Sequence, residues 1–90
     1  MIHHLDNFLS YIASEKGLSL NTIDAYGRDL TSFIEFLQIK KIIAITEIDE
    51  ELIIGFLTEL KKKSFAATTI YRHLVSIKVF FKFLKREGLI

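Results

Sequence analysis

The sequence predicts an all-α fold of four helices, and three observations lead to this prediction. Apolar residues recur every three or four positions through most of the chain, which is the spacing of amphipathic helices. No proline interrupts these stretches. No segment alternates apolar and polar residues long enough to indicate a half-buried strand. With 90 residues, half of them apolar, the chain can bury one core, so we expect residues 1–90 to form one domain.

The first helix is expected over roughly residues 2–15 and the second over about residues 20–38. Gly17 should end the first helix, because glycine readily adopts the left-handed conformation that closes helices. Ser19 is the expected N-cap of the second helix. Gly27 lies inside that helix, where it costs ~1 kcal/mol relative to alanine, and we attribute it to a tight helix crossing. The expected buried faces are Leu5, Phe8, Leu9 and Ile12, and then Ile23, Tyr26, Leu30, Phe33, Ile34 and Leu37.

The third helix should follow an ordered apolar connection over residues 39–48, which has no partner strand. Asp49 is its expected N-cap, and Glu50 and Glu51 fall in its first turn, where negative charge suits the helix dipole. Residues 61–63, three lysines, suit the dipole at its C-terminal end. The expected core positions are Leu52, Ile53, Phe56, Leu57 and Leu60.

The fourth helix is expected from about Ala67 to Glu87. Its apolar residues recur at alternating intervals of four and three, which predicts a core face of Ile70, Leu74, Ile77, Phe81 and Leu84. The other side of the helix is then expected to hold Arg72, Val75, Val79 and Phe83. Because this helix is apolar on more than one side, it should pack on two neighbours or bind a partner.

The charges are sorted along the chain. Residues 1–60 hold ten acids and four bases, a formal charge of −6, whereas residues 61–90 hold eight bases and one acid, a formal charge of +7. A basic stripe on one helix is typical of a protein that binds a polyanion. A solvated lysine face that keeps an apolar helix soluble is the alternative.

No enzyme signature is present. The chain has no cysteine, no glycine-rich phosphate loop and no metalloprotease or serine-hydrolase motif. None of its three histidines has a metal-ligand partner at a suitable spacing, and His73 is interpreted as structural or solvent-facing. We therefore assign no catalytic residue, no metal site and no cofactor. No apolar run is long enough to span a bilayer and no secretory signal is evident, so we expect no membrane contact and a cytoplasmic location.

Three segments, residues 17–30, 49–60 and 68–90, together resemble a known family. The most specific patterns are Ser19-x-x-Thr22-x-x-x-Tyr26-x-x-Asp29-Leu30 and Thr69-Ile70-x-Arg72-x-Leu74-x-x-Ile77-Lys78-x-Phe80-Phe81-x-Phe83-Leu84. In this order and spacing they are similar to the N-terminal core-binding, SAM-like domain of tyrosine recombinases and phage integrases, and most of all to that of Xer-type recombinases.

The resemblance implies a small orthogonal four-helix bundle that forms half of a clamp around double-stranded DNA. The second and fourth helices would face the major groove of the recombination half-site. A separate C-terminal catalytic domain, expected after Ile90, would carry the nucleophilic tyrosine and form a 3′-phosphotyrosyl link within a DNA-bound tetramer of recombinase protomers. Chromosome-dimer resolution and integration of a mobile element both remain open.

Carried onto this sequence, the resemblance implies a set of DNA-binding residues: Asn21, Thr22, Arg28, Thr68, Thr69, Arg72, Lys78 and Lys82. The chemistry of these side chains agrees with DNA binding. Hydroxyls and amides at a helix N-terminus suit phosphate oxygens, and arginine can bind phosphate or guanine. Other interpretations stay open: Thr22 and Thr69 could only cap or hydrogen-bond within their helices, and Lys78 could only extend along the apolar stripe. Tyr26 is expected in the core.

The sequence departs from the family pattern at two positions. Gly27 stands where the family usually has arginine, so one phosphate contact is missing or moves to Arg28. Ala66 replaces the usual serine before the fourth helix, so we expect Ser64 to supply the cap.

Two other functions fit parts of the sequence. The first is a helical protein-interaction module with a basic flank, whose exposed surface over residues 79–83 binds an acidic partner. The second is a helix-turn-helix repressor, which is disfavoured because the expected linkers are too long.

Overall fold

A computed structural model describes residues 1–90 and contains four α-helices and no strand. The helices are α1 (Ile2–Ser14), α2 (Leu20–Ile39), α3 (Glu50–Lys62) and α4 (Ala67–Arg86), and a short 3-10 turn, η1 (Ile45–Glu47), precedes α3. The predicted all-α fold class is confirmed. No helix is long and apolar enough to cross a membrane.

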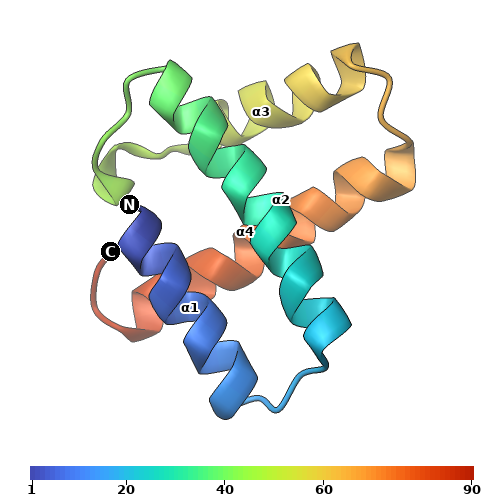
Figure 1. Ribbon diagram of the computed structural model, residues 1–90. Coiled ribbons are helices and arrows are strands. Elements are labelled where there is room, and N and C mark those ends of the chain that lie inside the picture. The colour runs from blue at the N-terminus through green and yellow to red at the C-terminus, as the bar shows by residue number, and fades with distance from the viewer.

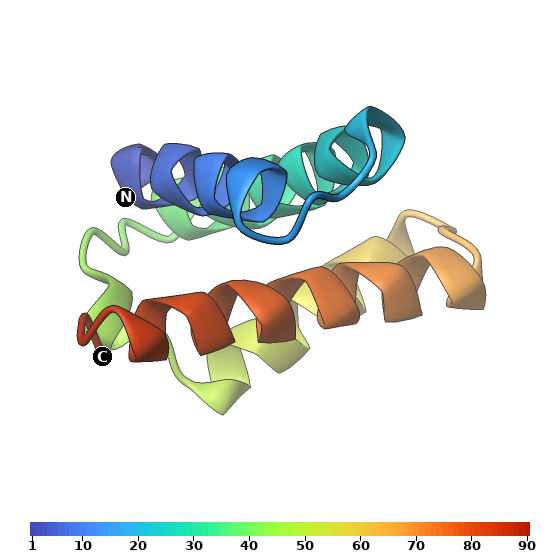
Figure 2. The same ribbon diagram turned by 90° about the horizontal axis from the view of Figure 1, so that it is seen from below.

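The helices form two layers. Figure 2 shows α1 and α2 in one layer and α3 and α4 in the other. In Figure 1, α2 runs diagonally across α4, and Figure 2 shows the two chain ends in opposite layers. Helix α2 packs on both α1 and α4, while α3 packs on α4. Helix α1 also packs on α4, so the crossing of α2 and α4 is the larger of two contacts that join the layers.

The caps explain why the helices begin where they do. The Ser19 hydroxyl accepts from the Thr22 amide at 3.3 Å, and the Asp49 carboxylate accepts from the Leu52 amide at 2.9 Å, so both predicted N-caps are confirmed. Gly17 has φ = +61°, the left-handed conformation expected of it. Residues 40–49 join α2 to α3, close to the predicted connection over residues 39–48, and within them the Glu47 carboxylate accepts from the Ala44 amide at 2.9 Å.

The predicted cap of α4 was wrong. Ser64 has φ = +65° and its amide donates to the Lys61 carbonyl at 3.0 Å, so it closes α3 instead. Ala66 occupies the N-cap position of α4, without a side-chain hydrogen bond. Because Ser64 is needed to reverse the chain after α3, its hydroxyl is not at the start of the next helix.

The core contains fourteen buried apolar residues drawn from all four helices and η1: Leu5, Phe8, Ile12, Leu30, Phe33, Ile34, Leu37, Ile45, Phe56, Leu60, Ile77, Phe80, Phe83 and Leu84. All predicted positions on α1, α2 and α3 are in this core or packed against it. Tyr26 is half-buried, and its ring meets that of Phe8 edge-on with centroids 5.9 Å apart. This agrees with the core position expected for Tyr26.

The predicted core face of α4 was partly wrong. Ile77 and Leu84 are buried, but the three other predicted residues are only half-buried, and Phe83 lies in the core instead of on the far side. The buried face of α4 includes His73 and Ser76, two polar residues that a hydrophobic pattern omits. The buried face of α4 is rotated from the predicted one because His73 and Ser76 pack towards an acid on α2.

That acid is Asp29, which is only 2% exposed. The Arg72 Nε donates to Asp29 Oδ2 at 3.0 Å, and Arg72 Nη2 donates to Oδ1 at 2.8 Å. The Ser76 hydroxyl also donates to Oδ2, at 2.8 Å. A carboxylate removed from water needs such partners, because burying an unpaired charge is very unfavourable. Arg72 therefore faces α2, contrary to its predicted place on the far side of α4.

His73 completes this network, so of the two roles expected for it, structural or solvent-facing, the structural one holds. Its Nδ1 lies 2.8 Å from the Thr69 carbonyl oxygen, and its Nε2 lies 3.4 Å from Asp29 Oδ1. Since a carbonyl oxygen only accepts, Nδ1 carries a hydrogen. The ring is thereby fixed with its other nitrogen towards the buried carboxylate.

The surroundings of Asp29 act on its pKa in opposite directions. Burial alone raises the pKa of this carboxyl, but the hydrogen bonds from Arg72 and Ser76 and the charges of His73 and Arg72 outweigh burial and leave the pKa lowered. The hydrogen bond to Asp29 likewise raises the pKa of Arg72. The folded state therefore favours the charged pair.

The first prediction concerns Gly27, for which the expected tight crossing was wrong. A Cβ atom added there would lie 3.6 Å from Leu9 Cδ1, an ordinary van der Waals separation. Because alanine is the better helix former, Gly27→Ala should raise the free energy of unfolding by about 0.5–1 kcal/mol in urea denaturation. Gly17→Ala is the matched control and should lower it, since its φ is +61°. A loss of stability in Gly27→Ala would contradict the conclusion that α1 leaves room for a Cβ atom at residue 27.

The second prediction concerns acid stability. Because the pKa of Asp29 is lowered on folding, its stabilisation is full above the ordinary carboxyl value of about 3.9 and is lost as the pH falls through the folded-state pKa. Asp29→Asn should lower the free energy of unfolding at pH 6 by roughly 1.5–3 kcal/mol, the range for hydrogen bonds to charged groups. Denaturation curves from pH 6 to pH 2 should show this difference shrinking. Parallel curves for the two proteins would contradict the prediction.

Candidate nucleic-acid interface

A cleft of about 310 Å³ lies between the first half of α2 and the middle of α4. Its lining residues are Asn21, Thr22, Ala25, Tyr26, Asp29, Arg72, Val75 and Ser76. Three of the predicted DNA-binding residues, Asn21, Thr22 and Arg72, are thus brought together from two helices. We call this feature the α2–α4 cleft.

The start of α2 forms one side of the cleft. Asn21 and Thr22 lie in its first turn and are exposed. The Thr22 hydroxyl is 2.9 Å from the Ser19 hydroxyl, so Thr22 takes part in the cap and remains accessible. The free amides and the dipole at a helix N-terminus attract anions. This side of the cleft therefore offers both polar side chains and a positive electrostatic potential.

Arg72 forms the opposite side, with its side chain 51% exposed. Two of its five N–H groups bind Asp29, through Nε and Nη2, and three remain for other acceptors. The Nε–Nη2 edge is occupied, so a second bidentate contact would have to use the Nη1–Nη2 edge. Asp29 thus holds the guanidinium at the cleft and leaves it able to bind phosphate or a base.

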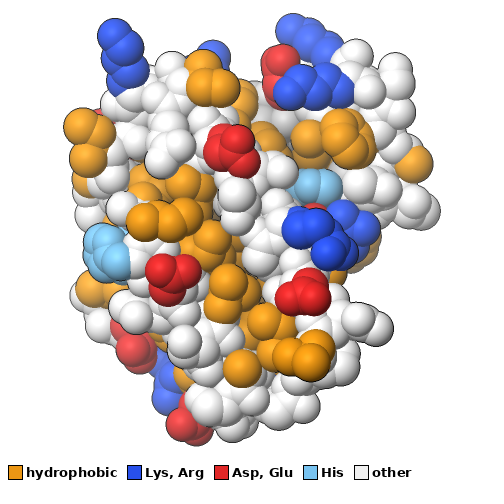
Figure 3. Space-filling view, in the orientation of Figure 1, with side chains coloured by type: hydrophobic (Ala, Val, Ile, Leu, Met, Phe, Trp, Pro, Cys, Tyr) orange, Lys and Arg blue, Asp and Glu red, His pale blue; other side chains and the backbone are white.

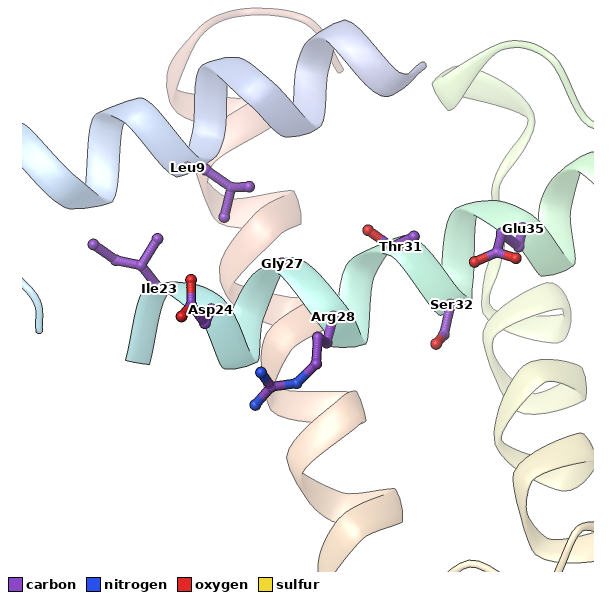
Figure 4. A pocket seen from close by; sticks show the side chains of 8 residues that line it. All are labelled: Leu9, Ile23, Asp24, Gly27, Arg28, Thr31, Ser32 and Glu35. Atoms are coloured by element: carbon purple, nitrogen blue, oxygen red, sulfur yellow. The ribbon is translucent and has the colours of Figure 1, made fainter. Parts of the chain in front are cut away.

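Arg28 lies outside the α2–α4 cleft. It lines a separate shallow hollow of about 660 Å³ together with Leu9, Asp24, Gly27 and Glu35, among others. Figure 4 shows the Arg28 side chain pointing away from Leu9, on the opposite side of α2. At 100° per residue, Arg28 falls within about 20° of Asn21 around the helix, two turns further on. Arg28 therefore extends the Asn21 side of α2.

The predicted residues of α4 divide into two groups. Thr68 is exposed one turn before Arg72, whereas Thr69 is half-buried and its carbonyl accepts from His73. Lys78 and Lys82 are exposed, but they lie about 120° and 80° around the helix from Arg72. Of these residues only Arg72 lines the α2–α4 cleft, whereas Lys82 lines a separate groove between α1 and the C-terminal half of α4.

The surface around the cleft combines basic, acidic and apolar groups. Figure 3 shows a cluster of Lys or Arg side chains beside the crossing of α2 and α4, next to a histidine, with acidic groups nearby. No group of three or more His, Cys, Asp or Glu side chains is arranged to hold a metal ion. The arrangement is suited to binding an anion through arginine, hydroxyl and amide donors.

Sequence reasoning missed the role of Asp29 and the contribution of Ser76 and Val75. A signal was present, because Asp29 directly precedes Leu30 on the apolar face of α2, and Arg72 and Ser76 are four residues apart on α4. An acid on an apolar face requires donors from a neighbouring helix. Which helix supplies them depends on the crossing of α2 and α4, and the sequence pattern does not specify that crossing.

Comparison with known proteins agrees with this architecture. Residues 5–88 match the family model described as phage integrase, N-terminal SAM-like domain. The chain is 34% identical over 90 residues to tyrosine recombinase XerC of Roseiflexus castenholzii, covering 100% of this chain and 29% of that protein. It is 41% identical over 83 residues to XerC of Listeria monocytogenes serotype 4a, covering 92% of this chain and 28% of that protein.

A further relative is tyrosine recombinase XerD of Listeria innocua, 32% identical over 85 residues, covering 93% of this chain and 29% of that protein. No solved structure matches. The chain thus spans less than a third of the length of these relatives. Since the family model covers nearly all of its residues and the four helices follow the expected order, the chain belongs to the N-terminal SAM-like domain family of phage integrases, in its Xer-like form.

Proposed function

We propose that this chain is the DNA-binding domain of a site-specific tyrosine recombinase and that it grips the recombination half-site through α2 and α4. The observation that carries this proposal is the α2–α4 cleft, where Asn21, Thr22 and Arg72 converge. In this proposal residues 1–90 position DNA and perform no chemistry themselves. A catalytic domain in the same protein and other recombinase protomers would complete a DNA-bound tetramer.

The geometry supports contacts to the DNA backbone first. The N-terminus of α2 and the exposed hydroxyl of Thr68 suit phosphate oxygens, and Arg28 extends the same side of α2. Lys78 and Lys82 would reach phosphates on the flank of the duplex, and Thr69 would contribute through the start of α4. Binding should then be mainly electrostatic and should weaken steeply as salt concentration rises.

The names of the relatives support the recombination context, because XerC and XerD are both tyrosine recombinases. The rival function, protein interaction over residues 79–83, needs an exposed apolar surface. Phe80 and Phe83 are buried and Phe81 is half-buried, so that segment is not exposed as a whole.

The third prediction is the location of the DNA surface. In an NMR titration of the labelled chain with a short duplex at low salt, amide shifts should cluster on residues 21–28 and 68–82. The same titration at higher salt should give smaller shifts, since released counterions drive such binding. Shifts confined to residues 61–63, or the absence of shifts, would contradict the proposed function.

The fourth prediction separates the two arginines. Arg72→Gln should weaken duplex binding by about 1–3 kcal/mol if Arg72 contacts a base. Arg28→Gln should remove one phosphate contact, which lowers the slope of log K against log salt concentration by about 1. Lys62→Gln is the matched control, an exposed cation at the end of α3, and should bind as the unmodified chain does. Fluorescence anisotropy at several salt concentrations measures both effects.

Arg72→Gln also removes a partner of Asp29, so its folding is checked by circular dichroism and thermal unfolding at the binding temperature. If the folded Arg72→Gln and Arg28→Gln variants both bind DNA like the unmodified chain, the α2–α4 cleft is not the docking surface.

A further inference from the structure

An apolar groove of about 410 Å³ lies between the end of α3 and the first half of α4. Leu57, Phe65, Tyr71 and Leu74 are among its apolar lining residues, and Lys61 is the charged residue that lines it. Tyr71 is 67% exposed and Phe65 is 44% exposed, so this apolar surface is open to solvent. We call it the α3–α4 groove.

The α3–α4 groove lies on the side of α4 opposite the α2–α4 cleft. Arg72 and Ser76 of α4 both bind Asp29 on α2, and at 100° per residue Leu74 lies about 160° from each of them around the helix. Figure 2 shows α3 and α4 together in the layer that faces α1 and α2. The groove therefore opens on the outer face of the α3–α4 layer, away from α2.

Helix α3 carries a stripe of four residues beside this groove: Glu50, Ile54, Leu57 and Lys61. At 100° per residue they fall within about 60° of one another around the helix. Ile54 is 55% exposed, Glu50 and Lys61 are exposed, and Leu57 is half-buried. The helix dipole accounts for an acid in the first turn and a base in the last, but it does not account for the apolar side chains between them. A continuous exposed apolar surface of this kind marks an interaction site.

The charges of the stripe are unpaired within the chain. Both ion pairs of the structure involve Asp29, with Arg72 and with His73. Glu50 and Lys61 therefore have no oppositely charged partner in the fold, and both remain available to another chain.

The stripe is complementary to itself when it is reversed. Glu50 and Lys61 are equally far from the point between residues 55 and 56, and so are Ile54 and Leu57. A second α3 laid antiparallel about that point places Glu50 opposite the partner's Lys61 and Ile54 opposite the partner's Leu57. Because the two copies are related by a twofold rotation, each of these contacts forms twice. The antiparallel direction also brings opposite ends of the two helix dipoles together.

We propose that α3 pairs with the antiparallel α3 of a second copy of this chain, and that Phe65 and Tyr71 extend the contact at the α3–α4 groove. The contact is isologous, with the same surface on both copies, so it closes as a dimer. Each copy contributes little more than one helix face, so we expect the pairing to be weak and reversible. The pairing needs no nucleic acid and leaves both α2–α4 clefts open, so it does not rest on the proposed DNA binding.

Sedimentation velocity at protein concentrations up to about 1 mM, which covers weak association, tests the pairing. The sedimentation coefficient of the unmodified chain should rise with concentration. Glu50→Lys and Lys61→Glu should each lose the rise, because like charges then face each other at both ends of the stripe. An equimolar mixture of these two variants should recover the rise, since a contact between them restores opposite charges at both ends.

Ile54→Gln removes an apolar contact without changing any charge, and it should also lose the rise. The matched control is Lys63→Glu, which makes the same change of charge at an exposed lysine at the end of α3 that lines a different hollow, with Phe36 and Phe56. It should associate as the unmodified chain does, and circular dichroism checks that every variant is folded. An unmodified chain that stays monomeric over this concentration range, a mixture that does not associate, or an Ile54→Gln variant that associates normally would overturn the proposal.

Discussion

The buried carboxylate of Asp29 constrains both the packing and the surface of this protein. Its partners, Arg72 and Ser76, lie more than forty positions further along the chain, on the other helix layer. An apolar contact between α2 and α4 would tolerate sliding or rotation, whereas three hydrogen bonds with fixed directions do not. The network thus sets the rotation of α4, which explains why His73 and Ser76 are buried while Ile70 and Leu74 remain at the edge of the core.

The same network determines what the surface can bind. With Asp29 on α2 and Arg72 on α4, the guanidinium is held beside the N-terminal turn of α2, where Asn21 and Thr22 are exposed. A long arginine side chain free in solvent would lose considerable conformational entropy on binding a phosphate. Here much of that loss has already occurred during folding, and three N–H groups stay available. Stability and the proposed DNA binding therefore depend on the same side chain.

The sequence predicted the local features well because local chemistry decides them. Ser19 and Asp49 cap their helices within three residues of their partners, and Gly17 closes α1 through its own backbone conformation. The failures depend on contacts between distant segments. Ser64 was assigned to α4 although the turn after α3 uses it, and the face of α4 follows a carboxylate on α2. For the site, the family resemblance predicted Asn21, Thr22 and Arg72, which the structure brings together. The position of Asp29 on the apolar face of α2 indicated that it needs donors, but only the crossing of α2 and α4 identifies Arg72 as one of them.

The segregation of charge along the chain has little to do with holding the fold together. Residues 1–60 hold most of the acids and residues 61–90 most of the bases. Between these two parts of the chain, Asp29 and Arg72 form the one carboxylate–guanidinium ion pair. The other charges lie at the surface, where isolated pairs contribute little to stability. Their placement instead leaves basic residues on α4 and acidic residues at the start of α3 without partners in the chain. A near-neutral protein of this kind therefore presents two surfaces of opposite charge.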